Sequence, residues 1–76
     1  MIVKADFEYN DLVEVDLIRL WGADENVLFV GLDFISLKNV VREYGVSSDL
    51  VDMTSGWQRD RLARAIAETN LAVVND

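Results

Sequence analysis

Carboxylates, hydroxyls, lysines and arginines are the groups here that could carry out chemistry, because the 76 residues include no histidine and no cysteine. Two carboxylate pairs stand out: Asp24 is adjacent to Glu25, and Asp49 precedes Asp52 by three residues, about one helical turn. Paired carboxylates can share a proton or bind Mg²⁺ or Ca²⁺. Neither pair belongs to a series with EF-hand or Walker spacing, and solvated acids at helix starts explain both. We therefore predict no catalytic residue, no metal site and no cofactor.

The composition points to the surface as the seat of function. Without cysteine and histidine the chain has no disulfide and no Cys/His zinc site, which are the usual reinforcements of so short a domain. Its 51% of apolar residues is enough for one hydrophobic core, so we expect a single domain over residues 1–76. A catalytic cleft of about 300 Å³ would consume much of that core. The chain is therefore expected to bind a partner and not to be an enzyme.

The charge is negative and unevenly distributed. Fourteen acidic and seven basic side chains give a net charge of −7, which disfavours binding to nucleic acids and anionic membranes. Residues 1–33 hold eight acids and two bases, whereas residues 34–76 hold six acids and five bases. A solvated surface with a chance gradient would explain this. The alternative is one acidic face and one mildly basic face that meet head to tail between molecules.

The candidate partner-binding residues follow from this asymmetry. Arginine and tryptophan together form the composition enriched in the hot spots of interfaces, although solvation or a core position would also account for them. The candidates are three acids in the N-terminal half, and one tryptophan with three arginines in the C-terminal half: Asp11, Glu14, Asp16, Trp57, Arg59, Arg61 and Arg64.

The clearest predicted element is a helix over residues 34–44. Leu37, Val41 and Tyr44, with Val40 beside them, recur at the spacing of one helical face. Asp33 is a suitable N-cap, and Gly45 stands where a left-handed residue commonly ends a helix. A second helix is predicted over residues 56–69, where Ser55 and Gln58 have the spacing of a capping box and Leu62, Ala65, Ile66 and Thr69 share a face.

Two further helices are predicted with less regular patterns. Over residues 11–21, Asp11 and Glu14 again have capping-box spacing, and one face carries Val13, Leu17, Leu20 and Trp21. Over residues 48–53, Ser47 or Ser48 would cap a short helix that turns Leu50, Val51 and Met53 inward.

Residues 1–9 and 26–32 are ambiguous, because Ile2, Val3, Phe7 and Tyr9 could begin a strand and Val27–Val30 has high β propensity. Two strands alone make a weak sheet, so we favour a short helix over residues 25–31. The predicted fold is all-α, a compact bundle of five or six short helices. A small α+β domain with a two-stranded sheet is the alternative. The expected core is Leu17, Leu20, Leu37, Val40, Val41, Tyr44, Leu50, Leu62 and Ile66.

The segment from Leu37 to Met53, followed by Gln58 to Ile66, resembles the death-fold superfamily, and in particular bacterial death-like or effector-associated domains. Those domains show a helix that ends in Leu-Gly-Val or Leu-Gly-Ile, a short leucine-bearing helix, a glycine turn, and a helix rich in arginine and alanine. The resemblance covers residues 34–69. It implies a non-catalytic adaptor that associates with like domains, in bacteria within antiphage defence.

A second resemblance is to acyl or peptidyl carrier proteins, through Gly31-Leu32-Asp33 and Arg42-Glu43-Tyr44-Gly45-Val46. In that family the serine that carries phosphopantetheine follows the aspartate, and here Phe34 takes its place. Ser36 is two residues late, about 200° around a helix. The chain would therefore be a degenerate carrier without carrier chemistry.

We thus expect a protein-binding adaptor that forms homo- or hetero-oligomers with the same or a like domain. The alternative is a small acidic inhibitor that masks a basic surface on its partner. The first residues lack a basic region followed by an apolar run, and the longest apolar run, Val27–Val30, is far shorter than a membrane span. We expect a cytoplasmic location.

Overall fold

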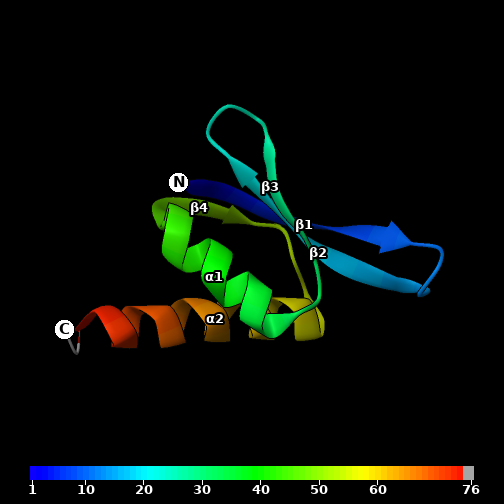
Figure 1. Cartoon of the computed structure of the whole chain (residues 1–76). Coiled ribbons are helices and arrows are strands. Elements are labelled where there is room, and N and C mark those ends of the chain that lie inside the picture. The colour runs from blue at the N-terminus through cyan, green and yellow to red at the C-terminus, as the bar shows by residue number, and fades with distance from the viewer. Residues whose placement is uncertain (75–76) are drawn as a thin grey trace.

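Strands form most of the N-terminal half of the chain. In the computed structural model, which describes the backbone of residues 1–74 and the side chains of residues 1–69, the elements follow one another as shown in Figure 1. They are β1 (Ile2–Asn10), β2 (Val15–Gly22), β3 (Val27–Gly31), α1 (Phe34–Tyr44), β4 (Val46–Asp52) and α2 (Gly56–Val74). The domain is α+β, so the prediction of an all-α, death-fold-like helical bundle was wrong.

The four strands form one mixed sheet in the order β3-β2-β1-β4. The first three strands are a meander of antiparallel neighbours. After α1 the chain returns as β4, which pairs with β1 in parallel through Ile2 opposite Val46 and Ala5 opposite Asp52. β3 and β4 are therefore the two edge strands of the sheet.

The predicted helix over residues 11–21 is in fact a hairpin turn followed by β2. Ile18 and Leu20 are buried on one face of this strand, and Arg19 and Trp21 point to the opposite face. Leucine and arginine are good helix formers, and the predicted stripe from Val13 to Trp21 has helical spacing. Val15 and Ile18 lie off that stripe, and they fit the two alternating faces of a strand. Pairing with β1 and β3 on both sides decided between the two.

The other short helices were also predicted wrongly. Residues 25–31 form a turn and β3, and residues 48–53 fall mostly in β4. β4 contains Ser47, Ser48 and Asp49, which favour turns and caps over helix interiors, and its β-branched valines fit a strand. The alternative of an α+β domain was nearer, although the sheet has four strands instead of two.

The two clearest helices were predicted correctly. α1 covers Phe34–Tyr44, with Asp33 as its N-cap, whose carboxylate accepts a hydrogen bond from the Ser36 backbone N–H, and with Gly45 at a φ of 72°. α2 begins at Gly56 as expected and continues to Val74. The expected capping box is absent from α2: Gln58 donates instead to the backbone carbonyl of Asp16, 3.3 Å away in β2.

The core lies between the helices and one face of the sheet (Figure 1). Leu20, Leu37, Val41 and Leu62 are buried as expected, and Val40, Leu50 and Ile66 pack against them while only partly buried. Tyr44 is 41% exposed and Leu17 is half-buried on the other face of the sheet, so neither belongs to the core. The core residues not expected from the sequence are Ile2, Ala5, Ile18 and Ala65.

The helices leave the opposite face of the sheet uncovered. Trp21 lies there, on an open hollow of about 740 Å³ that extends from the β2–β3 turn to Val51 of β4. Neither helix, over the residues that the structure describes, is long and apolar enough to cross a membrane.

Candidate interaction surfaces

A two-stranded arm projects from the sheet. β1 pairs with β4 only up to Ala5, and β2 pairs with β3 only from Ile18 onward. Beyond these positions β1 and β2 pair, within residues 1–74, only with each other, with Glu8 opposite Leu17 and Asn10 opposite Val15. Figure 1 shows this ribbon extending past the end of the helical layer. We call residues 7–17 the hairpin arm.

The tip of the arm has a defined conformation. The Asn10 side-chain oxygen accepts hydrogen bonds from the backbone N–H groups of Leu12, at 2.9 Å, and Val13, at 3.1 Å. Asparagine closes turns in this way because its short side chain reaches the backbone two or three residues on. Glu14 completes the turn in the left-handed region, at a φ of 54°. This turn holds Leu12 in solvent, 94% exposed.

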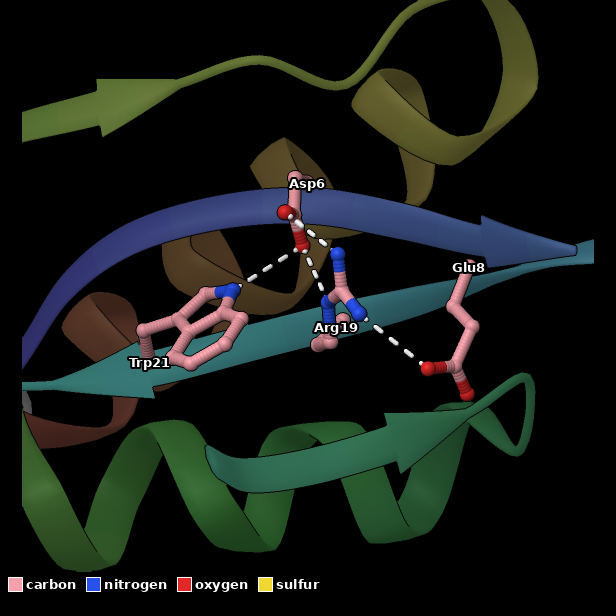
Figure 2. Close-up of polar contacts among 4 residues, drawn as sticks. All are labelled: Asp6, Glu8, Arg19 and Trp21. Atoms are coloured by element: carbon pink, nitrogen blue, oxygen red, sulfur yellow. Dashed lines mark hydrogen bonds and ion pairs between the residues drawn. The ribbon is translucent and has the colours of Figure 1, made fainter. Parts of the chain in front are cut away.

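At the base of the arm, a polar network on the uncovered face of the sheet joins β1 to β2 (Figure 2). The Asp6 carboxylate accepts two hydrogen bonds from the Arg19 guanidinium, both at 2.8 Å, and one from the Trp21 indole N–H at 3.1 Å. A third guanidinium nitrogen of Arg19 donates to Glu8 at 3.1 Å. One arginine of β2 is thereby bound to two carboxylates of β1.

Charge stabilises this network in the ionised state. The hydrogen bonds from Arg19 hold the pKa of Asp6 below its usual value, although partial burial opposes this. The same partnership raises the pKa of Arg19. Two cations also lie over the ring of Trp21, with Lys4 Nζ at 4.9 Å and Arg19 Cζ at 5.0 Å from its centroid. Trp21 is therefore a fixed part of the uncovered face and does not anchor the core.

A second surface lies where the start of α1 meets the first turns of α2. Two arginines alternate there with two aromatic rings: Arg61 Cζ lies 5.3 Å from the centroid of Trp57, and Arg64 Cζ lies 5.1 Å from that of Phe34. Together with Asp60, these residues line a hollow of about 340 Å³, which we call the aromatic hollow. Arg61 also donates to the backbone carbonyl of Leu32 at 2.7 Å, which fixes it against the loop before α1.

The structure distributes the seven predicted partner-binding residues over these surfaces. Asp11 and Glu14 are exposed at the tip of the hairpin arm, and Asp16 is half-buried in its β2 strand. Trp57, Arg61 and Arg64 line the aromatic hollow.

Arg59 lies apart from that hollow. Its guanidinium donates to the backbone carbonyl of Thr54 and is 3.9 Å from the Asp52 carboxylate. Asp11 and Glu14 at the tip therefore lie apart from the aromatic hollow, as a head-to-tail contact would require. Asp16 instead lies beside the start of α2, where Gln58 donates to its backbone carbonyl.

The network of Asp6 and Arg19 was not anticipated from the sequence, and neither were Leu12 at the tip, Asn10 beneath it and Phe34 in the aromatic hollow. Asn10 carried a signal that could have been used, since adjacent asparagine and aspartate, here Asn10 and Asp11, are typical of a turn between strands. Phe34 was noted only as the residue in the place of a carrier serine. Its position opposite α2 depends on helix packing that the sequence does not show.

The carboxylate pairs do not form a metal site. Asp49 lines the hollow on the uncovered face, whereas Asp52 accepts hydrogen bonds from Thr54 at the end of β4. Residues three apart in a strand point to opposite faces, so the expected helical juxtaposition is lost. In the part of the chain that the structure describes, no group of three or more acidic side chains is placed to hold a metal ion.

Comparison of this chain with protein-family models, with curated proteins and with solved structures finds no match. The helical bundle that the death-fold resemblance implied is not the fold that the chain adopts. The interpretation of the surfaces therefore rests on their own geometry and chemistry.

Proposed function

We propose that this chain is a non-catalytic protein-binding domain and that the hairpin arm is its binding element. One observation carries the proposal: Leu12, a large apolar side chain, is 94% exposed at the tip of a turn whose backbone is held by Asn10. Single exposed leucines are common on protein surfaces. One that is held at the end of a projecting, hydrogen-bonded turn is positioned for insertion into a partner.

The rest of the arm supports the same use. Phe7, Tyr9 and Val13 are 42%, 59% and 59% exposed, so the arm carries further apolar surface between its tip and its base. Exposed apolar surface gathered on one element is typical of interaction sites on soluble proteins. A two-stranded ribbon is marginally stable alone, and the Arg19 network at its base provides the stiffening that a binding element needs.

The acids of the arm define the kind of partner. Glu8, Asp11 and Glu14 are exposed along it, so a complementary surface would be apolar at its centre and basic at its rim. An inhibitor that masks a basic surface on another protein would use the same arm, and this is the second candidate function. The same acids disfavour nucleic acid as a partner. The cytoplasmic location expected from the sequence stays a prediction.

Site-specific photo-crosslinking tests this proposal. A photo-reactive amino acid replaces Leu12 in one variant and Asp24, in the exposed turn between β2 and β3, in a matched control. Irradiation is carried out on the purified protein and in native lysate. We expect crosslinked products from position 12 and not from position 24. Equal products from both positions, or none from position 12 in either sample, would refute the hairpin arm as the binding element.

A further inference from the structure

We infer that the tip of the hairpin arm of one molecule docks into the aromatic hollow of a second copy of this chain. This inference rests on the proposed function and names the partner. The tip presents a leucine with a carboxylate on either side, Asp11 before it and Glu14 two residues after it. The aromatic hollow presents the complementary arrangement.

The floor and rim of the aromatic hollow fit that tip. Phe34 and Trp57 provide apolar ring surface, and Trp57 is 44% exposed. Arg61 lies over the ring of Trp57 and Arg64 over that of Phe34, and Lys38 Nζ is also 5.0 Å from the Phe34 centroid. The volume of about 340 Å³ is near the lower limit of about 300 Å³ for small-molecule pockets, so it suits one side chain and its flanks better than a larger ligand. Tryptophan and arginine are also the residues most enriched at the energetic centres of protein interfaces.

The charges of the aromatic hollow favour the binding of an acidic group from a second molecule. Within the described part of the chain Arg61 makes no ion pair, and its hydrogen bond goes to a neutral carbonyl. Asp33 is the nearby acid: its pKa is lowered mainly by hydrogen bonds from Ser36 and to a smaller degree by the charge of Arg61. Arg64 pairs with Glu68 at 2.8 Å but keeps 73% of its side chain exposed, so it can reach a second carboxylate. Among the residues whose side chains the structure describes, Asp60 is the one acid that lines the hollow itself.

The tip of a molecule does not occupy its own hollow. Leu12 is 94% exposed, and the arm extends past the helical layer in which the aromatic hollow lies (Figure 1). Tip and hollow are different patches, so the contact is heterologous. Every copy carries both patches, so contacts close reciprocally in a dimer or continue into a chain. Such a contact is small, and small interfaces are weak and transient.

Two single variants test the contact. Leu12→Ser removes the apolar tip, and Arg64→Glu reverses a charge at the hollow while replacing a largely exposed side chain. Matched controls are Met53→Ser, 58% exposed near the end of β4, and Arg42→Glu, exposed on α1. Circular dichroism establishes that each variant is folded, and sedimentation equilibrium gives the molar mass up to about 1 mM, the range of weak contacts.

We expect the molar mass of the wild-type chain and of both controls to rise with concentration, and both test variants to associate more weakly than the wild type. An equimolar mixture of Leu12→Ser and Arg64→Glu should regain a two-copy mass, because the intact tip of one variant meets the intact hollow of the other. A wild-type chain that stays monomeric to about 1 mM, or test variants that associate as the wild type does, would overturn the inference. Crosslinking from position 12 to another protein alone would also overturn it, while leaving the proposed function in place.

Discussion

Asp6 of β1 and Arg19 of β2 lie directly opposite each other, and their carboxylate and guanidinium form a bidentate ion pair where the hairpin arm leaves the sheet. One position further along, at Ile18, the pairing of β2 with β3 ends, and β1 has already parted from β4 after Ala5. Directly opposed charges on one face of an antiparallel pair stabilise it, and the diagonal bond from Arg19 to Glu8 extends the contact into the arm. The pair therefore links the stability of the sheet to the rigidity of the binding element.

Replacing Asp6 by Asn should destabilise the protein. The change removes the negative charge that accepts two hydrogen bonds from Arg19. Glu8 is then the carboxylate that remains paired with this partly buried guanidinium. We expect a loss of about 1–2 kcal/mol in the free energy of unfolding, measured by urea denaturation. Glu8→Gln is the matched control, because the Glu8 side chain is 51% exposed and its pair should contribute less than about 0.5 kcal/mol. Equal losses from both variants would contradict the central role of Asp6.

The stability of the protein should fall at acidic pH. Asp6 has a lower pKa in the folded protein than its usual value of 3.8, mainly because of its hydrogen bonds to Arg19. A depressed folded pKa contributes stability that is present above the unfolded pKa and is lost as the pH falls through the folded pKa. Asp33 and Glu68 are shifted in the same direction, by hydrogen bonds from Ser36 and Arg64 respectively.

We therefore expect the melting temperature to decrease as the pH is lowered from about 5 to about 2. Thermal melts followed by circular dichroism at several pH values measure this, and Asp6→Asn should show a smaller decrease. A melting temperature that rises over this range, or an Asp6→Asn slope equal to that of the wild type, would show that Asp6 does not contribute in this way.

The conformation of the arm tip should depend on Asn10. Replacing Asn10 by Ala removes both hydrogen bonds to the backbone of Leu12 and Val13. We expect faster hydrogen exchange at those two amides, and a loss of about 1 kcal/mol or less in global stability, because the tip is exposed. Hydrogen exchange followed by NMR measures both. Asp24→Ala in the other turn of the meander should leave these amides unchanged, and unchanged exchange in Asn10→Ala would show that the turn holds itself without this side chain.

The sequence predicted the two long helices but not the sheet, and the difference has a physical cause. α1 is specified locally, since Asp33, Gly45 and one apolar stripe all lie within the segment itself. β2 is specified by its neighbours: its leucines and arginine suit a helix, and the Asp11–Glu14 spacing that resembles a capping box belongs to a hairpin turn. Strand pairing between distant residues is not visible in a local pattern.

The candidate surfaces were anticipated to a similar extent. Composition singled out Trp57, Arg61 and Arg64, because charge and aromatic character can be read without a fold, and α2 places them together. Phe34 and Leu12 were missed, since their roles depend on the packing of α1 beside α2 and on the length of the unpaired arm. The network of Asp6 and Arg19 was missed for the same reason: the two residues are 13 positions apart and meet only in the sheet.

The charges of the tip and of the aromatic hollow should determine self-association together. Asp11→Arg gives a tip that is repelled by Arg64 of the second copy, and Arg64→Glu gives a hollow that repels the native tip. Each single variant should weaken association about fivefold, the effect of about 1 kcal/mol for exposed charges. The double variant Asp11→Arg/Arg64→Glu joins a basic tip to an acidic rim and should recover most of the wild-type association. Asp24→Arg, with the same charge change in the other turn, should behave as the wild type.

Raising the salt concentration from about 0.05 M to about 0.5 M should weaken the wild-type association, because exposed charges are then screened. The double variant should respond in the same direction. Sedimentation equilibrium gives all of these constants. A change in net charge alone would act equally on Asp11→Arg and Asp24→Arg, which carry the same total charge. Arg64→Glu also breaks the pair that Arg64 forms with Glu68 within one chain. Only a direct contact between tip and hollow makes the double variant associate more strongly than both single variants. A double variant that associates as weakly as either single variant would show that the tip and the hollow do not contact each other.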